Sequence, residues 1–348
     1  FKVLGGIDAV PLCVATSGVD DLVALVEALA PSFGGINLED ISAPRCFAVL
    51  DRLRDSLPIP VWHDDQQGPA TVVLAARENA LVEVGKRLDQ VDVTLVGIGA
   101  ANMAVLHLLE VAGVDPGRVV AVDRGGTLHS ERHDIADARD HLPGKWRVCT
   151  TTNRRGVRGG VADALDGADV CLAFSRPGPG TIEPAWVATM APDAIVFACA
   201  NPTPELWPWE AAGAGARVVA TGRSDFPNQV NNSLGFPGIF RGVLDVRARS
   251  ITDEMALAAA GQLAAFARER GLDRGLLPRM DEWEVVPKVA AAVGAEARGL
   301  GLAGVDATTE ELEAHAAEVI GAARHLTERL MADGTIAPIP DELRGPAR

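Results

Sequence analysis

Short apolar runs alternate with amphipathic stretches over about the first 250 residues of the chain. A short apolar run predicts a buried strand, and apolar residues spaced by three and four predict a helix. We therefore expect strands at residues 34–38, 59–62, 91–96, 119–122, 170–174, 195–198 and 218–220, separated by helices that include 21–30, 44–57, 100–112 and 184–190. This alternation predicts an α/β fold with a doubly wound, mostly parallel sheet covered by helices on both faces.

The pattern becomes entirely helical after about residue 250. Apolar positions at helical spacing predict helices at 251–270, 287–299 and 308–333. Thr308 and Thr309, followed by Glu310 and Glu311, are typical of a cap at the start of the last helix. Residues 334–348 contain three prolines, and we expect them to form an arm that lies on a neighbouring surface.

Composition narrows the class of protein. The 348 residues include 47 acidic and 32 basic side chains, and the net charge of −15 argues against a nucleic-acid partner, which needs a basic face. No apolar stretch reaches membrane-spanning length and no signal-peptide pattern opens the chain, so we expect no membrane partner. The five cysteines include no Cys-x-x-Cys pair, which favours a reducing, cytoplasmic setting.

The chain has no tyrosine, and its lysines are few. Only Lys2, Lys86, Lys145 and Lys288 are present, so most of the basic residues are arginine. A mechanism that takes a phenol acid from this chain is therefore excluded, and a lysine base has few candidates.

Two pairs of acidic residues follow predicted strands. Glu39 and Asp40 come after the strand at 34–38, and Asp64 and Asp65 come after His63 at the end of the next strand. The helix between them is expected to begin near Ser42, as a cap, with Pro44 in its first turn. A strand–helix–strand unit of this size predicts parallel strands, which place both pairs at the same carboxyl edge.

Four carboxylates at one edge repel one another unless a cation lies between them. Oxygen ligands of this kind suit Mg²⁺ or Mn²⁺ rather than zinc. The alternative is a set of surface and helix-capping acids, which a single pair would favour. Two pairs at matching strand ends favour the metal site.

The strand at 91–96 is followed by a dinucleotide-binding turn, Gly97-Ile98-Gly99-Ala100-Ala101-Asn102, and then by a helix. The two glycines allow backbone N–H groups to approach a pyrophosphate. Asn102 replaces the usual third small residue, so helix–strand packing there is expected to be looser or shifted. Asp123, at the end of the next strand, fits a carboxylate that holds the ribose 2′-hydroxyl and favours NAD. Arg124 beside it leaves NADP open as the alternative.

Asparagines and turn-forming residues follow the last two predicted strands. One segment is Asn201-Pro202-Thr203-Pro204-Glu205, and the other runs over residues 222–232 and ends in Asn228-Gln229-Val230-Asn231-Asn232. Amides at strand ends suit a small polyoxygenated substrate, whereas turn chemistry alone would explain each segment taken separately. A third segment, 153–160, is expected to be a solvated turn, with phosphate binding as the less favoured alternative.

Several long motifs resemble those of bacterial NAD(P)-dependent malic enzymes. They are Phe33-Gly34-Gly35-Ile36-Asn37-Leu38-Glu39-Asp40-Ile41, His63-Asp64-Asp65-Gln66, Ala200-Asn201-Pro202-Thr203-Pro204-Glu205 and residues 222–232, with further matches at 235–242 and 280–284. The resemblance extends from Phe1 to about Pro340. It implies oxidation of L-malate at C2 and decarboxylation of the bound oxaloacetate to pyruvate and CO₂, with NAD or NADP and with Mg²⁺ or Mn²⁺.

The resemblance also implies roles for individual residues. Glu39, Asp40 and Asp65 would be the metal ligands, Asp64 would be the partner of a catalytic lysine, and Asn201 and Asn232 would contact the substrate. The cofactor-binding set would be Gly97, Gly99, Ala100, Asn102, Asp123 and Ser175.

The implied division has three parts. Residues 1–80 would be the remainder of an N-terminal substrate and metal domain, 81–250 a Rossmann-like NAD(P)-binding domain, and 251–348 C-terminal helices with an arm. The family forms dimers, so a homodimer is the implied assembly.

The family's catalytic lysine and tyrosine have no counterpart among these residues. In register with Phe1-Lys2, the Glu-Gly-Lys segment that carries the lysine would lie four residues before Phe1, and the Tyr-Thr-Pro-Gly segment would lie further upstream. In the family the lysine is the base toward the C2 hydroxyl, and the tyrosine protonates the enolate. Lys2 is near in sequence but out of register.

Three interpretations follow. In the first, the sequence is that of a malic enzyme without its N-terminal segment. The second is a related binding protein that keeps the metal and nucleotide sites without catalysis. The third is a changed reaction, such as oxo-acid reduction or decarboxylation, in which water or Lys2 transfers the proton. We favour the first for identity, with low or absent activity for the chain as written.

Overall fold

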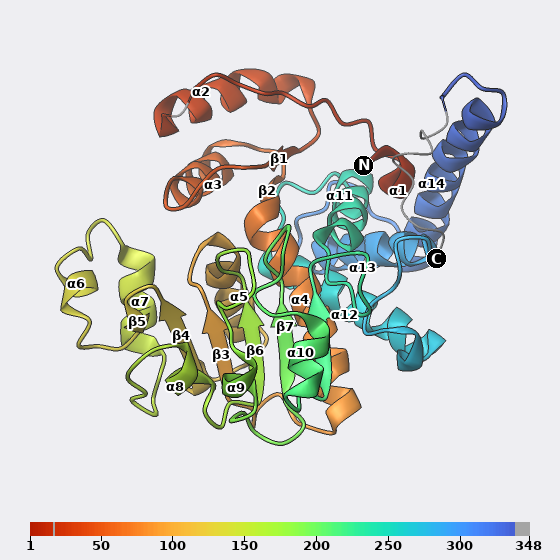
Figure 1. Ribbon diagram of the computed structural model, residues 1–348. Helices are drawn as coiled ribbons and strands as arrows, with labels where there is room; N and C mark the ends of the chain where they lie inside the picture. The colour runs from red at the N-terminus through yellow and green to blue at the C-terminus, as the bar shows by residue number, and fades with distance from the viewer. Residues whose placement is uncertain (17, 338–348) are drawn as a thin grey trace.

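The computed structural model describes residues 1–16 and 18–337, and in this part the strands form two sheets (Figure 1). The larger sheet has six strands in the order β5-β4-β3-β6-β7-β8, namely β3 (Val93–Val96), β4 (Val119–Asp123), β5 (Gly126–Thr127), β6 (Val170–Ala173), β7 (Ile195–Ala198) and β8 (Val218–Thr221). All neighbouring strands are parallel except β4 and β5. The predicted α/β fold with a mostly parallel sheet is therefore confirmed. Because β4 and β6 flank β3 on opposite sides, the carboxyl end of β3 is the position where such sheets bind ligands.

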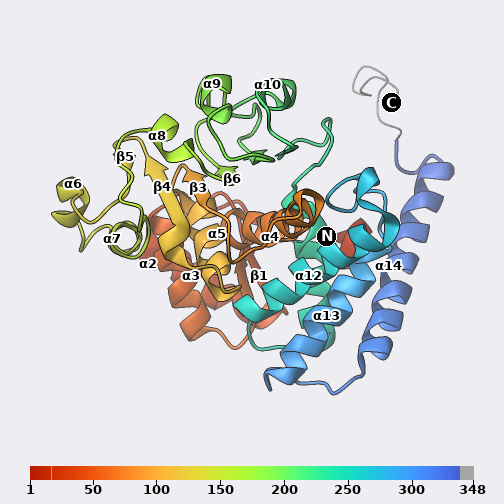
Figure 2. The same ribbon diagram turned by 90° about the horizontal axis from the view of Figure 1, so that it is seen from below.

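Helices cover both faces of this sheet (Figure 2). The helices α4 (Asp64–Val84), α5 (Ala100–Val111) and α12 (Asp253–Arg270) lie on one face, and α8 (Val161–Leu165), α9 (Pro184–Val187) and α10 (Pro208–Gly213) lie on the other. Along β6, Leu172 packs into the apolar cluster of the first face, whereas Cys171 and Ala173 pack into that of the second. Both faces of the strand are buried, which is why its sequence is continuously apolar.

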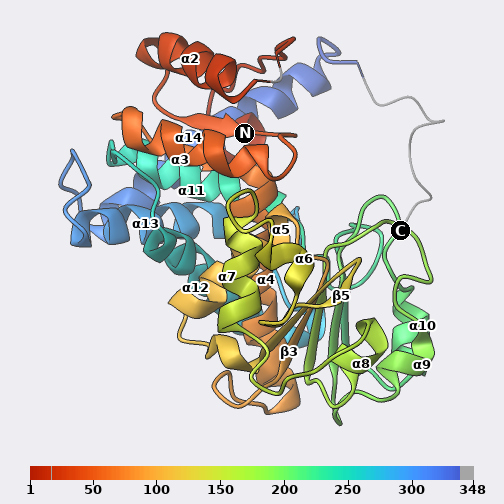
Figure 3. The same cartoon turned by 90° about the vertical axis from the view of Figure 1, so that its left-hand side faces the viewer.

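The smaller sheet belongs to an N-terminal unit. It pairs β1 (Ile36–Leu38) with β2 (Val61–His63) in parallel, and the unit also contains α2 (Val19–Leu29), η1 (Ala30–Ser32) and α3 (Arg45–Ser56). Its apolar cluster includes Leu38, Leu53 and Val61. Figures 1 and 3 place α2 and α3 at one end of the molecule, beyond the large sheet.

The C-terminal part is helical. It comprises η3 (Asn232–Leu234), α11 (Phe236–Asp245), α12, η4 (Leu272–Arg274), α13 (Val285–Gly299) and α14 (Thr309–Ala332), and the short N-terminal helix α1 (Lys2–Gly5) packs against α14. The helices predicted at 251–270, 287–299 and 308–333 are present as α12, α13 and α14. The predicted cap is confirmed, because Thr308 Oγ1 accepts from Glu311 N and Glu311 Oε2 accepts from Thr308 N. Of the arm predicted at 334–348, residues 338–348 lie outside the described part. Within the described residues, no helix is both long and apolar enough to cross a bilayer.

The remaining short elements connect strands of the large sheet along the chain. They are η2 (Pro116–Arg118), α6 (His133–Ala136) and α7 (Pro143–Thr151).

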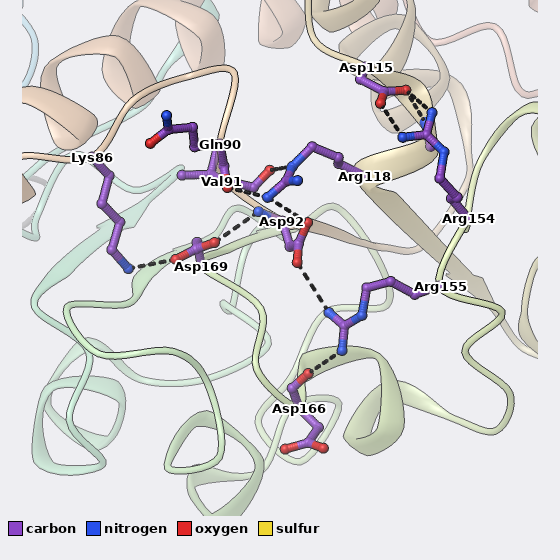
Figure 4. A network of polar contacts seen from close by, with 11 residues as sticks. Lys86, Gln90, Val91, Asp92, Asp115, Arg118, Arg154, Arg155, Asp166 and Asp169 are labelled. Atoms are coloured by element: carbon purple, nitrogen blue, oxygen red, sulfur yellow. Dashed lines mark hydrogen bonds and ion pairs between the residues drawn. The ribbon is translucent and has the colours of Figure 1, made fainter.

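Ion pairs link the strand ends at the amino edge of the large sheet (Figure 4). Asp169 accepts from Lys86 Nζ at 2.7 Å and from Asp92 N at 2.9 Å, and the Asp92 carboxylate faces Arg118 at 3.2 Å and Arg155 at 3.5 Å. These bonds hold the sheet at the end away from its carboxyl edge.

Some local predictions were wrong. The helix α3 begins at Arg45 after Pro44, which makes no side-chain cap, so Ser42 is not its cap. The segment 153–160 is largely exposed, as expected of a solvated turn, but Asn153 at its start is buried and its Nδ2 donates to Leu128 O and Val157 O. Asn102 is fully buried and its Nδ2 also donates to Leu172 O of β6, while looser or shifted packing at this position stays a prediction. The 21-residue helix α4 was not predicted.

Candidate functional site

The two acidic pairs come together at the carboxyl ends of β1 and β2. Leu38 is in register with His63, so the residues that follow each strand are neighbours. Asp40 N donates to Asp65 Oδ2 at 2.8 Å. Asp64 and Asp65 are the first two residues of α4, where the helix dipole favours negative charge.

Asp64 is buried and joins two distant parts of the chain. Its carboxylate accepts from Trp62 Nε1 at 3.2 Å and from the side-chain amide of Asn232. Gly68 makes room for it, because a Cβ there would lie 2.3 Å from Asp64 Oδ1. Burial, together with the nearby Glu39 and Asp65 carboxylates, raises the pKa of Asp64 to about 7. The fold therefore brings together one predicted catalytic residue and one predicted substrate-binding residue.

Glu39, Asp40, Asp64 and Asp65 form what we call the acidic edge, and its oxygen ligands suit a hard divalent cation. Burial first, and then the neighbouring Asp65 and Asp40 carboxylates, raise the pKa of Glu39, although a hydrogen bond from Asn37 opposes the rise. Mutual repulsion of this kind is what a bound cation relieves. Among the described residues, however, no three His, Cys, Asp or Glu side chains are arranged so as to hold a metal. The set Glu39, Asp40 and Asp65 therefore stays a prediction.

The dinucleotide turn lies at the carboxyl end of β3. Gly97 has a φ of 83°, and a Cβ there would lie 2.6 Å from Phe174 O, so the position requires glycine. Asn102 Nδ2 donates to Val96 O at 3.1 Å and to Gly97 O at 2.7 Å. Because Asn102 lies beneath the turn, it can support the turn from below but has no surface to offer a cofactor. Gly99 and Ala100 begin α5, as expected of the pyrophosphate-binding end.

Asp123 is not a free carboxylate. Its side chain is 14% exposed, and it accepts from Arg132 Nη1 at 3.0 Å and from Lys145 Nζ at 3.0 Å. Its Oδ1 also accepts from Gly125 N. Burial acts to raise the pKa of Asp123, but the hydrogen bonds from Arg132 and Lys145 outweigh it and lower the pKa. Arg132 and Lys145 were not predicted as partners of Asp123, because they lie 9 and 22 residues further along the chain.

Glu205 is a second residue that sequence reasoning missed. It is fully buried, and its Oε1 accepts from Ser175 N at 2.7 Å and from Ser175 Oγ at 3.1 Å, while its Oε2 accepts from Ala200 N at 3.0 Å. One carboxylate thus ties the loop after β6 to the loop after β7, which carries Asn201. Glu205 closes the motif at residues 200–205, but an acid in a turn-forming segment is usually exposed to solvent, so its burial was not predicted.

In the part of the chain that the structure describes, all four lysines pair with carboxylates other than Glu39, Asp40, Asp64 and Asp65. Lys2 pairs with Asp8 at 2.6 Å, Lys86 with Asp169 at 2.7 Å, Lys145 with Asp123 at 3.0 Å and Lys288 with Glu269 at 4.0 Å. Lys2 lies beside α14 and lines a groove with His315 and Leu326. The structure therefore gives no support to Lys2 as the base of a changed reaction.

Comparison with known proteins agrees with the motifs. Residues 66–298 match the family described as "Malic enzyme, NAD binding domain", and residues 14–54 match "Malic enzyme, N-terminal domain". The chain is 46% identical over 307 residues to the NAD-dependent malic enzyme of Geobacillus stearothermophilus, covering 88% of this chain and 62% of that protein. It is 43% identical to the bifunctional malic/malolactic enzyme of Bacillus subtilis, covering 90% of this chain and 74% of that protein.

A solved structure agrees in three dimensions. The malic enzyme of Entamoeba histolytica superposes with a TM-score of 0.94 at 45% identity, covering 98% of this chain and 71% of that one. The chain thus spans about 62% of the length of the Geobacillus relative and somewhat more of the other two. On the family match over residues 66–298 and on these identities, the chain belongs to the malic enzyme family.

Proposed function

We propose that this chain provides the metal-, substrate- and cofactor-binding parts of an enzyme that oxidises L-malate and decarboxylates the product to pyruvate and CO₂. The observation that carries the proposal is the bond between Asp64, at the start of α4, and Asn232, which lies 168 residues further along the chain. This bond joins the acidic edge to the segment 222–232, which is rich in side-chain amides. A polyoxygenated substrate would need both the metal-binding carboxylates and the hydrogen-bonding amides.

Glu39, Asp40 and Asp65 would hold Mg²⁺ or Mn²⁺. When bound, the ion would polarise the C2 oxygen of the substrate and stabilise negative charge after loss of CO₂. Asn201 and Asn232 would orient the substrate through amide hydrogen bonds. Asp64 is already held by Trp62 and Asn232, so it would fix the position of the Asn232 side chain.

Gly97, Gly99 and Ala100 would bind the pyrophosphate of NAD or NADP through backbone N–H groups at the start of α5. Asp123 would accept from the ribose hydroxyl, and Ser175, fixed by Glu205, would lie along the cofactor. Asn102 would hold the backbone of the turn in place through its hydrogen bonds to Val96 O and Gly97 O.

We propose that turnover by the 348-residue chain is low or absent. The chain has no tyrosine, and each of its four lysines is paired with a carboxylate away from Asp64. The base and the acid that the family uses are therefore not provided by these residues. A second candidate function, binding of metal and nucleotide without catalysis, rests on the same observation.

Titration of this chain with Mn²⁺ in a calorimeter, followed by separate assays of malate oxidation and oxaloacetate decarboxylation, tests these proposals. We expect Mn²⁺ to bind, Asp65→Asn to weaken it at least tenfold, and the exposed control Asp55→Asn to leave it unchanged. Mn²⁺ binding without either reaction supports the second candidate. Malate-dependent NADH formation at a rate ordinary for enzymes, about 10 per second, contradicts impairment. Equal Mn²⁺ affinity in Asp65→Asn contradicts the ligand set.

Asp123 provides a test of cofactor choice. In Asp123→Ser, Arg132 and Lys145 lose their shared carboxylate and become available to a 2′-phosphate. We expect the ratio of NADP to NAD affinity, measured by titration, to rise at least tenfold, or about 1.4 kcal/mol. Asp140→Ser, which removes an exposed acid before α7, is the control. An unchanged ratio in Asp123→Ser would show that this cluster does not face the cofactor.

A further inference from the structure

Arg77, in the middle of α4, is a buried cation without a matching anion. Its side chain is 3% exposed, and Nε and Nη1 have no hydrogen-bond partner among the described residues. Burial lowers its pKa to about 10, so the guanidinium stays charged at neutral pH. A buried charge without a partner costs several kcal/mol.

The acid beside Arg77 in sequence, and the acid that holds Lys86 of the same pocket, are both already paired. Glu78, the neighbour that favours its charged form, pairs with Arg268 at 2.7 Å across the surface between α4 and α12. Asp169 is held by Lys86 at the amino edge of the sheet (Figure 4). Among the described residues, the buried Nε and Nη1 donors of Arg77 therefore have no acceptor, and an anion from outside the chain would supply one.

Arg77 lines a pocket of about 420 Å³ between α4, the end of α5 and α12. The walls are mainly apolar and include Leu74, Leu81, Leu88 and Leu257. Lys86 also reaches the pocket, but its ammonium is bonded to Asp169 and Pro192 O. Glu78 also lines the pocket, but it is paired with Arg268. The unpaired guanidinium beside leucines suits a single negative charge attached to an apolar group.

We propose that this pocket is a binding site for a monocarboxylate with a short apolar chain, whose carboxylate pairs with Arg77. Guanidinium groups bind carboxylates through two parallel hydrogen bonds, and the leucines cover the chain of the ligand. A dianion is disfavoured, because its second charge would meet no free cation here.

The site is separate from the candidate active site. Arg77 lies 13 residues after Asp64 on the same helix, which corresponds to about 20 Å along the helix axis. A ligand there would contact the helix whose first turn holds Asp64 and Asp65. Binding does not depend on the proposed malate reaction and is measured without it.

The test uses the whole chain and calorimetric titration with acetate, butanoate and hexanoate at constant ionic strength. We expect the affinity to rise about fourfold for each added CH₂ and hexanamide, which lacks the charge, not to bind. Arg77→Leu should weaken hexanoate at least tenfold, whereas Arg217→Leu, an exposed arginine paired with Glu83 at the end of α4, should leave it unchanged.

A second variant keeps Arg77 and fills the pocket. Gly261 on α12 lines the pocket, and a Cβ there would meet no atom within 4 Å, so Gly261→Leu is compatible with the fold. It should also weaken hexanoate at least tenfold, with thermal unfolding used to confirm that the variant is folded. The proposal is overturned if the folded wild-type chain binds none of the carboxylates, if inorganic phosphate binds more tightly than hexanoate, or if both pocket variants bind hexanoate like the wild type.

Discussion

At the scale of single residues, buried polar side chains hold the loops of the candidate site in place. Asn102 fixes the dinucleotide turn from below through Val96 O and Gly97 O, and Glu205 fixes Ser175 and Ala200 from behind. Both side chains are fully buried. Buried polar groups of this kind are costly to leave unpaired, so they define loop geometry rather than contact a ligand.

We expect Glu205→Ala to destabilise the chain by about 2–4 kcal/mol, because it leaves the N–H groups of Ser175 and Ala200 without their acceptor. Glu205→Gln keeps one acceptor oxygen and should cost about half as much. Unfolding in urea measures both. Glu183→Gln, an exposed acid just before α9, is the control.

A measurement of NAD affinity shows whether Glu205 positions Ser175 for the cofactor or only stabilises the fold. If Glu205 positions Ser175, then Glu205→Gln should weaken NAD severalfold at a temperature where the variant is fully folded. Unchanged NAD affinity in the folded variant would mean that Glu205 only stabilises the fold.

At the scale of elements, α4 connects the site to the rest of the molecule. It begins with Asp64 and Asp65, and it packs against both α5 and α12. Its residues are buried around most of its circumference, including the polar Gln66 and Asn79. A helix buried on all sides has no amphipathic stripe, which explains why its sequence does not reveal it by periodicity.

The last helix, α14, offers a direct measure of local capping. Thr308→Ala removes the acceptor for Glu311 N and should cost about 1 kcal/mol. Thr309→Ala is the matched control, because Thr309 is the first helical residue and its hydroxyl caps no N–H. Chemical unfolding followed by circular dichroism compares the two. Equal losses from both changes would show that the cap contributes nothing of its own.

At the scale of the whole molecule, polar contacts between distant elements join the sheet to the C-terminal helices. His107 on α5 lies 2.7 Å from Asp253, the first residue of α12. The hydrogen bond to Asp253 raises the pKa of His107, against the effect of burial, and the bond to His107 lowers the pKa of Asp253. Glu110, Arg147 and Arg54 are the other charged groups near the pair.

This contact predicts a pH window of stability. The His107 pKa is raised, so its contribution is complete below 6.5 and is lost as the pH rises through the folded value above that. The Asp253 pKa is lowered, so its contribution is complete above 3.8 and is lost as the pH falls through the folded value below that. Because His107 is half exposed, the pair should contribute about 0.2–1 kcal/mol.

Urea unfolding of wild type and His107→Gln at pH 5.5 and pH 9 measures this contribution. We expect the variant to be less stable at pH 5.5 and the difference to shrink at pH 9. His141→Gln, a histidine without a carboxylate partner in the described part of the chain, is the control. A difference that stays constant with pH would contradict the charged pair.

The sequence alone determined much about this protein, since the described β-strands other than β5, the acidic pairs and the dinucleotide turn follow from local patterns. β7 lies at the predicted residues 195–198, and the predicted cap at Thr308 is present. Both predictions were correct because a short apolar run and a helix cap each depend on only a few neighbouring residues. The family also followed from contiguous motifs. The position of the carboxylates at one edge followed from the parallel pairing of β1 and β2.

Only the tertiary structure decided which side chains neutralise or orient one another. The bond between Asp64 and Asn232 spans 168 residues, and Arg132 and Lys145 reach Asp123 from other elements. Arg77 Nε and Nη1 have no acceptor among the described residues, and the adjacent Glu78 is paired with Arg268 instead. Such pairings depend on burial and on distance in space, and neither quantity is encoded in the spacing of residues along the chain.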